Sequence, residues 1–282
     1  MIAFIFNHGL TLENVGEPLI PRDYVLVRPL KVGFDGLENA VYNGLIWAKP
    51  GIVLGGMGIV KVIEGGVDSE WETLAGKTAV VSPYSKAYGG LGIEINGIAA
   101  ERGAVPKDAL FPYFPELGDL NVLLPFASIA VKVAQLAEGR KTLIVGYGVL
   151  GKLVSLALNN RAEVGVYTEG GRVDYGNTVS RIDPSQWDVV FVSIISSWPR
   201  VLLSDKKIIM PRLMASWPII GRERITFVEP EFVESAVNLL RSHEGKLKDV
   251  ILHSDSFTSA IPVPKGKIVL VNAEKALKTA SP

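Results

Sequence analysis

The sequence predicts an α/β protein of two domains, one a barrel-like β domain and the other a doubly wound parallel sheet. Its 282 residues suffice for about two domains, and a hydrophobic fraction of 48% supports ordinary buried cores. Short aliphatic runs separated by glycines fill the first third of the chain, whereas strand and helix patterns alternate beyond residue 119. We therefore expect one domain from residues 1–118 and 247–282, and a second from residues 119–246.

Composition excludes several classes of protein. The 29 Lys and Arg residues balance 29 Asp and Glu residues, so there is no basic excess to bind nucleic acid. Cysteine is absent, which excludes disulfides and thiolate zinc sites. The longest apolar stretch, residues 120–137, is interrupted by Pro125 and Lys132, so we expect no membrane span. Residues 1–7 lack the basic start of a signal peptide, and we expect a cytoplasmic protein.

The β domain is predicted from short strands with turn residues between them. Tyr24–Val32 is rich in aliphatic and β-branched residues and follows the turn sequence Pro21-Arg22-Asp23. Residues 83–97 are rich in glycine and predict a loop. The other strands expected in this domain are residues 52–54, 59–63, 78–82, 248–252 and 267–271.

The second domain is predicted from alternating strands and helices. Leu120–Ala137 has apolar residues at helical spacing, with Asp119 as a candidate N-cap and Gly139 as a candidate left-handed C-cap. A second helix is expected over residues 150–158, with apolar residues along one face, and a third over Pro230–His243. The expected strands are residues 142–145, 164–167, 189–195, 208–210 and 225–228. This alternation favours a parallel sheet with right-handed crossovers.

A glycine-rich turn between a strand and a helix is the strongest local motif. It reads Gly146-Tyr147-Gly148-Val149-Leu150-Gly151. In this context the first glycine permits a tight turn, the second lets a pyrophosphate approach the backbone, and the third lets helix and strand pack closely. The free amides of the helix N-terminus then face the phosphates. The turn therefore predicts dinucleotide binding; the alternative is a glycine turn that only packs the strand on the helix.

Other residues at strand ends are candidates for cofactor contacts. Glu169 lies where a carboxylate would bind the ribose 2′-hydroxyl of NAD, whereas Thr168 with Arg172 would suit the 2′-phosphate of NADP. The sequence leaves NAD and NADP both open. Ser193 and Ile194 lie at the end of a later strand, and we expect them to contact the nicotinamide or its ribose.

Segments spread over nearly the whole chain match the motifs of one known family. Residues 32–38 (VGFDGLE) are similar to its Val-Gly-x-Cys-Gly-Thr-Asp segment, and residues 50–66 to its Pro-x-x-Leu-Gly-His-Glu stretch and the next strand. Further matches are residues 21–28, 76–81, 97–101, 105–106, 123–127 and 267–270. On these motifs the chain resembles the medium-chain dehydrogenase/reductases, the zinc alcohol dehydrogenase superfamily. The resemblance implies a GroES-like β-barrel domain and a Rossmann domain that binds NAD or NADP.

The chain departs from this family at the zinc positions. The resemblance places Asp35, Gly56, Met57 and Leu124 where the family has its catalytic zinc ligands, and three of these four cannot bind the metal. Leu37 replaces the hydroxyl that relays the proton. The loop that carries the family's structural zinc is short here and has no cysteine. We therefore expect a zinc-free member, comparable in that respect to the quinone oxidoreductases.

The resemblance implies a zinc-independent NAD(P)(H)-dependent oxidoreductase that acts on a small carbonyl, alcohol or enone. Asp35, by family position near the nicotinamide, and Tyr84, in the shortened loop, are the candidate catalytic residues. Each also has a structural interpretation, as a capping aspartate and as a loop side chain. The alternative function is a catalytically inactive nucleotide-binding protein that serves as a sensor or assembly partner. The family's habit of pairing through nucleotide domains implies a homodimer.

Overall fold

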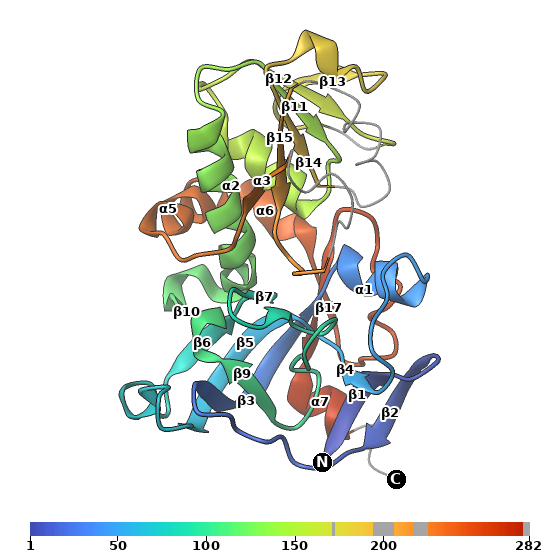
Figure 1. The fold of residues 1–282 in the computed structure, drawn as a ribbon, viewed down its shortest axis with the longest axis vertical. Coiled ribbons are helices and arrows are strands. Elements are labelled where there is room, and N and C mark those ends of the chain that lie inside the picture. Colours follow the sequence, from blue (N-terminus) through green and yellow to red (C-terminus); the bar gives the residue numbers. More distant parts are fainter. Residues whose placement is uncertain (171–172, 194–205, 217–224, 279–282) are drawn as a thin grey trace. The chain divides into compact units, whose positions relative to one another are not determined.

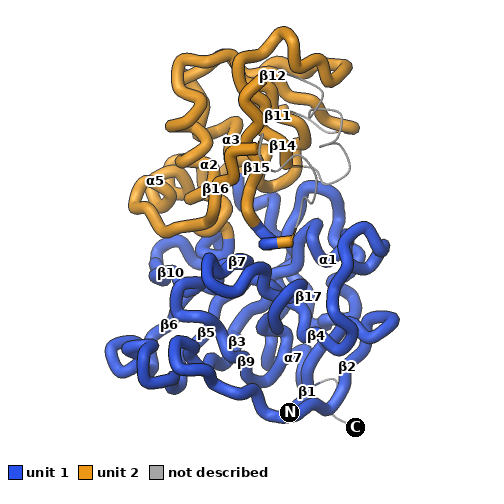
Figure 2. Tube along the Cα trace, viewed as in Figure 1, with its two compact units in different colours: residues 1–122, 213–215, 247–282 blue, residues 123–212, 216–246 orange. Residues whose placement is uncertain are grey.

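The chain forms two compact units, each described here by itself. The computed structural model describes residues 1–170, 173–193, 206–216 and 225–278, so the predicted cofactor residues Arg172 and Ile194 lie outside the described residues. Unit 1 comprises residues 1–122, 213–215 and 247–282, and unit 2 comprises residues 123–212 and 216–246 (Figure 2).

Unit 1 is built around a seven-stranded sheet with the order β10-β6-β5-β3-β18-β17, in which β9 also pairs with β3 (Figure 1). Its strands are β3 (Tyr24–Phe34), β5 (Met57–Gly65), β6 (Thr78–Val81), β9 (Gly103–Pro106), β10 (Leu110–Pro112), β17 (Ile251–Ser254) and β18 (Ile268–Asn272). The long strand β3 is antiparallel to β5, β9 and β18, so strands from both ends of the chain meet on it.

A second sheet of unit 1 was not expected from the sequence. It has the order β2-β1-β4 and consists of β1 (Ile2–Phe6), β2 (Leu10–Asn14) and β4 (Ile52–Val53). Phe4 of β1 stacks on Phe257 at 5.7 Å between ring centroids and meets Phe34 edge-on at 6.0 Å. All three rings are fully buried. This aromatic cluster therefore joins N-terminal and C-terminal parts of the chain in one core.

Short helices and a small hairpin complete unit 1. Helix α1 (Gly36–Tyr42) is held to the C-terminal segment by Asn39, whose side-chain amide donates to Val263 O at 2.8 Å and accepts from Val263 N at 2.7 Å. Residues 83–97, predicted as a loop, contain a hairpin of β7 (Tyr84–Ser85) and β8 (Gly89–Gly90). The remaining helical segments are η1 (Trp71–Thr73), η2 (Lys107–Ala109), η3 (Pro115–Leu123), η6 (Lys248–Val250) and α7 (Ala273–Lys278).

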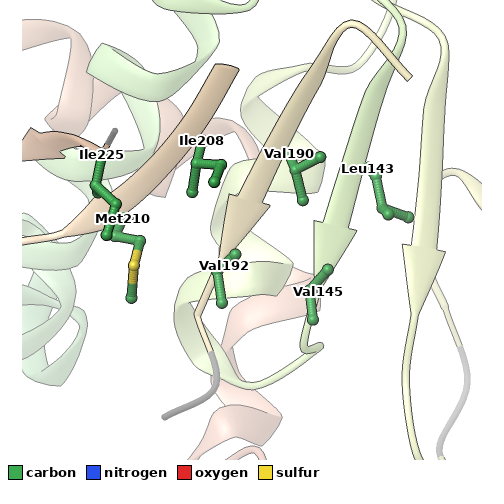
Figure 3. Close-up of a cluster of buried hydrophobic side chains, with 7 residues drawn as sticks. All are labelled: Leu143, Val145, Val190, Val192, Ile208, Met210 and Ile225. Carbon is green, nitrogen blue, oxygen red and sulfur yellow. The ribbon is translucent and has the colours of Figure 1, made fainter. Parts of the chain in front are cut away.

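Unit 2 contains a six-stranded parallel sheet with the order β13-β12-β11-β14-β15-β16. Its strands are β11 (Thr142–Val145), β12 (Val164–Tyr167), β13 (Asn177–Val179), β14 (Val189–Val192), β15 (Lys207–Pro211) and β16 (Ile225–Val228). Numbered along the chain, this order is 3-2-1-4-5-6, that of the doubly wound dinucleotide-binding fold. One face of the sheet carries a buried aliphatic cluster that runs from Leu143 to Ile225 (Figure 3). The predicted α/β class is confirmed.

The helices of unit 2 differ from prediction at their starts. They are α2 (Leu124–Leu136), α3 (Val149–Ala157), α5 (Glu234–Ser242) and α6 (Glu244–Leu247), with the turn η4 (Pro184–Gln186). Asp119 is not the N-cap of α2, because its carboxylate binds Lys31 and His253 instead. The predicted start at Pro230 is also wrong, since Val233 is still extended and α5 begins after it. Among the described residues, the run Pro115–Leu136 is long and apolar enough to cross a membrane, but 78% of its most apolar 18-residue stretch is buried within the protein.

We expect Asn39→Ala to lower the free energy of unfolding by about 2 kcal/mol, because it removes two hydrogen bonds and leaves the backbone groups of Val263 unpaired. Urea unfolding measures this loss. Asn43→Ala, at the exposed end of the same helix, is the matched control and should change stability little. Equal effects of the two substitutions would show that the Asn39 contact does not hold α1 in place.

Candidate functional site

The glycine turn of unit 2 has the backbone geometry that a dinucleotide site requires. Gly146 has φ of +103°, a conformation that side chains disfavour, and its N–H donates to Tyr167 O at 2.9 Å. At Gly151 a Cβ atom would lie 2.0 Å from Gly146 O. The first turn of α3 therefore packs directly on the end of β11, which only a glycine at position 151 allows.

The first amides of α3 lie before its first intrahelical hydrogen bond. Gly148 is the N-cap, no side chain caps the helix, and its first intrahelical bond runs from Lys152 N to Gly148 O at 2.9 Å. The amides of residues 149–151 therefore precede the first intrahelical bond. A Cβ at Gly148 would meet no atom within 4 Å. The side chains of Val149 and Leu150 are buried, so these two residues offer only their backbone to a ligand.

Three side chains near the turn are already engaged within the protein. The hydroxyl of Ser193, predicted as a cofactor contact, donates to Gly146 O at 3.1 Å and so holds the turn against β14. The hydroxyl of Tyr147 accepts from Asp174 N at 2.9 Å and from Ser155 Oγ at 3.3 Å. Lys152 pairs with the Asp174 carboxylate at 2.8 Å. Tyr147 and Lys152 therefore fasten the loop after β12 to α3, a contact that the sequence did not indicate.

The loop after β12 holds the residues expected to select the cofactor. The hydroxyl of Thr168 donates to Gly170 O at 2.6 Å, which shapes this turn, while Glu169 is exposed. Since Arg172 lies outside the described residues, the choice between NAD and NADP stays open.

Asp35 and Glu38 form a buried pair of carboxyl groups at the start of α1. Asp35 is the N-cap, and its Oδ1 accepts from Leu37 N at 2.6 Å. Glu38 completes a capping box, because its Oε2 accepts from Asp35 N at 2.8 Å. Its Oε1 accepts from Gly56 N at 3.4 Å. Each residue is 7% exposed. Asp35 therefore has the capping role of its structural interpretation. Its buried partner is Glu38, which was not among the candidate catalytic residues.

Burial makes both carboxyl groups hold their protons more tightly. It raises the pKa of Asp35, and it raises the pKa of Glu38 well above its ordinary value, with repulsion from Asp35 as a second cause. The pair therefore retains a proton to higher pH than an exposed carboxyl group does.

The other positions that the resemblance assigned to zinc ligands are closed by packing. A Cβ at Gly56 would lie 2.5 Å from Leu91 O, so a histidine cannot stand there without a backbone shift. Met57 and Leu124 are fully buried. Within the described residues, no group of three His, Cys, Asp or Glu side chains could hold a metal ion.

Tyr84, the second candidate catalytic residue, is buried in β7 at 5% exposure. Its backbone N–H donates to Ser82 Oγ at 3.4 Å, and Ser82 Oγ donates to Tyr84 O at 3.2 Å. Tyr84 and Asp35 both belong to unit 1, whereas the glycine turn belongs to unit 2. The structure thus brings together the glycine turn with Ser193, and Asp35 with Glu38.

Comparison with known proteins identifies the fold. No family model and no curated protein matches the chain. Among solved structures, glucose dehydrogenase of Haloferax mediterranei, in complex with NADP, Zn and gluconolactone, has a TM-score of 0.71 at 16% identity, covering 96% of this chain and 99% of that one. Galactitol-1-phosphate dehydrogenase of Escherichia coli has a TM-score of 0.68 at 14% identity, covering 96% of this chain and 100% of that one. Acetophenone reductase of Geotrichum candidum, in complex with NAD, has a TM-score of 0.67 at 16% identity, covering 96% of each chain.

The raised pKa values predict how stability depends on pH. A group whose pKa is higher in the folded protein stabilises it fully below its unfolded value, about 4, and that contribution is lost as the pH rises through the folded value. Asn at position 35 cannot ionise. As the pH rises above about 4, Asp35→Asn should therefore gain stability relative to the wild type in urea unfolding.

Asp183 is the matched control, because it is a half-buried N-cap aspartate whose pKa is lowered, mainly by its hydrogen bond with Ser185. For Asp183 the pH dependence has the opposite sign: the wild type should be more stable than Asp183→Asn at neutral pH, and this difference in stability should shrink as the pH falls. The same pH trend in both variants would contradict the assigned burial effect.

Proposed function

We propose that this chain, which has the two-domain fold of the medium-chain dehydrogenase/reductases, is a NAD(P)(H)-dependent oxidoreductase of the alcohol dehydrogenase type that works without zinc. The observation that carries the proposal is the glycine turn: its amides lie at the end of β11, and the space above Gly148 is open. A diphosphate at this point would accept hydrogen bonds from the amides of residues 149–151 and interact with the positive end of the α3 dipole.

The reaction needs a hydride and a proton. A bound nicotinamide supplies or takes up the hydride. For reduction of a carbonyl group, the proton has to come from the protein or from water. The buried carboxyl pair of Asp35 and Glu38 is the proton source that we propose in unit 1, because burial keeps it protonated above the range of an exposed carboxyl group.

The packing at the zinc positions supports the zinc-independent part of the proposal. Gly56 is wedged against the Leu91 carbonyl, and Met57 and Leu124 offer no ligand atoms suited to zinc. Asp35 alone remains as a carboxylate, and it is engaged with the α1 N-terminus. We propose a small carbonyl, alcohol or enone as substrate. Cytoplasmic location and a homodimer through the nucleotide-binding domain stay predictions.

The second candidate is a nucleotide-binding protein without catalysis. It is favoured by the capping box, in which both carboxyl groups at the expected catalytic position already accept backbone N–H groups. Such a protein would bind nicotinamide dinucleotides and act as a sensor or assembly partner.

Gly148→Val should abolish binding of NADH and NADPH while leaving the melting temperature nearly unchanged. The valine has room in the protein, because Gly148 has an ordinary φ of −75° and open space around it, but its methyl groups would occupy the volume that a pyrophosphate needs. Fluorescence titration of the reduced nucleotide measures the loss. Gly16→Val, at an exposed glycine with equally open space, is the matched control. Unaltered affinity in Gly148→Val would refute the assigned site.

Turnover of a panel of aldehydes, ketones, quinones and enones with NADH or NADPH should persist after dialysis against a strong chelator. The described residues include no cluster that could hold a metal ion, so chelation has nothing to remove from that part of the chain. Absorbance of the reduced nucleotide follows the reaction. Activity that disappears with the chelator and returns with Zn²⁺ would contradict zinc independence. Nucleotide binding without turnover on any substrate would favour the second candidate.

A further inference from the structure

The long strand β3 has a gap among its neighbours on one edge. Strand β5 pairs with one edge of β3 from Val25 to Gly33, so β9 and β18 share the other edge. Of that edge, β9 pairs with Tyr24–Val27 and β18 with Lys31–Phe34. Residues 28–30, between these two stretches, therefore have no strand beside them there.

A cavity of about 670 Å³ lies at this gap, and all the residues that line it belong to unit 1. Helix α7 packs against β3 in this part of the unit (Figure 1). The apolar lining consists of Pro29, Leu30 and Leu277. The volume is that of a pocket for a small molecule. The lining includes neither the glycine turn nor the buried carboxyl pair, so this cavity is separate from the site described above.

The acidic side chains of the cavity are already engaged within the protein. The three carboxylates in its lining each have a donor: Glu17 pairs with Arg102 at 3.5 Å, Glu101 Oε2 accepts from Ile2 N at 3.0 Å, and Glu274 pairs with Lys278 at 2.6 Å. Lys31, also in the lining, pairs with Asp119.

Arg28 lines the cavity without such a partner. Its guanidinium is exposed and forms no hydrogen bond or salt bridge with any residue that the structure describes. Its charge helps to lower the pKa of Glu274, although the hydrogen bond and the charge of Lys278 lower it more. In the sheet, Arg28 lies directly opposite Lys61 of β5, and like charges in that position destabilise a sheet. An anion beside Arg28 would offset this repulsion.

Asn272 supplies a second unused donor to the same cavity. Its Oδ1 accepts from Lys275 N at 3.1 Å at the start of α7, so its Nδ2 is the atom left for a ligand. Within residues 1–170, 173–193, 206–216 and 225–278, nothing accepts a hydrogen bond from this Nδ2. Asn272 is half-buried and Arg28 is exposed, so solvent reaches both. The cavity therefore offers unused donors beside an apolar wall, which suits a ligand that only accepts hydrogen bonds.

We propose that this cavity binds a small organic acid, with Arg28 and Asn272 donating to its carboxylate and the apolar wall packing against its carbon skeleton. The fork of a guanidinium group matches a carboxylate or a phosphate. The three carboxylates nearby repel a doubly charged phosphate more than a singly charged acid, and the apolar wall favours a carbon skeleton. This site is independent of the proposed function, because it shares no residue with the dinucleotide site.

Calorimetric titration of the full chain tests the site with three probes, hexanoate, phenylacetate and indole-3-acetate. At least one of these acids should bind. Its neutral amide should bind at least tenfold more weakly because it lacks the charge that Arg28 attracts, and acetate should bind more weakly because it lacks the carbon skeleton. These comparisons use the wild type alone. If none of the three acids binds, or if an acid and its amide bind equally, the proposal is refuted.

Two variants then locate the bound acid. Arg28→Met keeps an unbranched side chain but removes the donors, and it should weaken binding about tenfold. Asn272→Asp keeps the oxygen that accepts from Lys275 N but replaces the donor by a charged oxygen, so it should weaken binding at least as much. Lys49→Met, at an exposed lysine of unit 1 outside the cavity, is the matched control and should leave the affinity unchanged. Unchanged affinity in either cavity variant, or an equal loss in all three variants, would overturn the assignment.

Discussion

The close approach of helix α3 to the end of strand β11 is the constraint on which the nucleotide-binding unit depends. Gly146 turns with a positive φ, and Gly151 lies so near the Gly146 carbonyl that no Cβ fits between them. Ser193 holds that carbonyl from the neighbouring strand, and Tyr147 and Lys152 tie the next loop to the same helix. A ligand that binds the helix amides therefore meets a backbone whose position is set by packing.

The sequence predicted best those elements that local signals determine. Strands β11, β12 and β16 have the predicted bounds, because short aliphatic runs are flanked there by turn residues. The hairpin of β1 and β2 was missed because β2 is partly exposed and the burial of β1 depends on a core that distant parts of the chain complete. Proline at position 230 indicated a helix start, yet α5 begins at Glu234, since a proline fits extended backbone as well as a first helical turn.

Features of the candidate site that depend on neighbouring residues in the sequence could be predicted, whereas those that depend on tertiary contacts could not. Asp35-x-x-Glu38 is a capping-box pattern, so the partner of Asp35 was available from spacing alone. The burial of this pair beside the Gly56 amide could not be predicted from the sequence, because eighteen positions separate Glu38 from Gly56. The pairing of Lys152 with Asp174, and the cavity that Arg28 and Asn272 line, likewise depend on neighbours remote in sequence.

The place of β18 between β3 and β17 has a consequence for the order of synthesis. On the ribosome, the residues of β3 emerge long before those of β18, and the whole parallel sheet of unit 2 is translated in between. Until the final strands leave the exit tunnel, the part of β3 that pairs with β18, Lys31–Phe34, has no neighbour on that edge, and an open edge invites pairing with other chains. The first unit to start is thus the last to be completed, and a nascent chain is most exposed to aggregation in that interval.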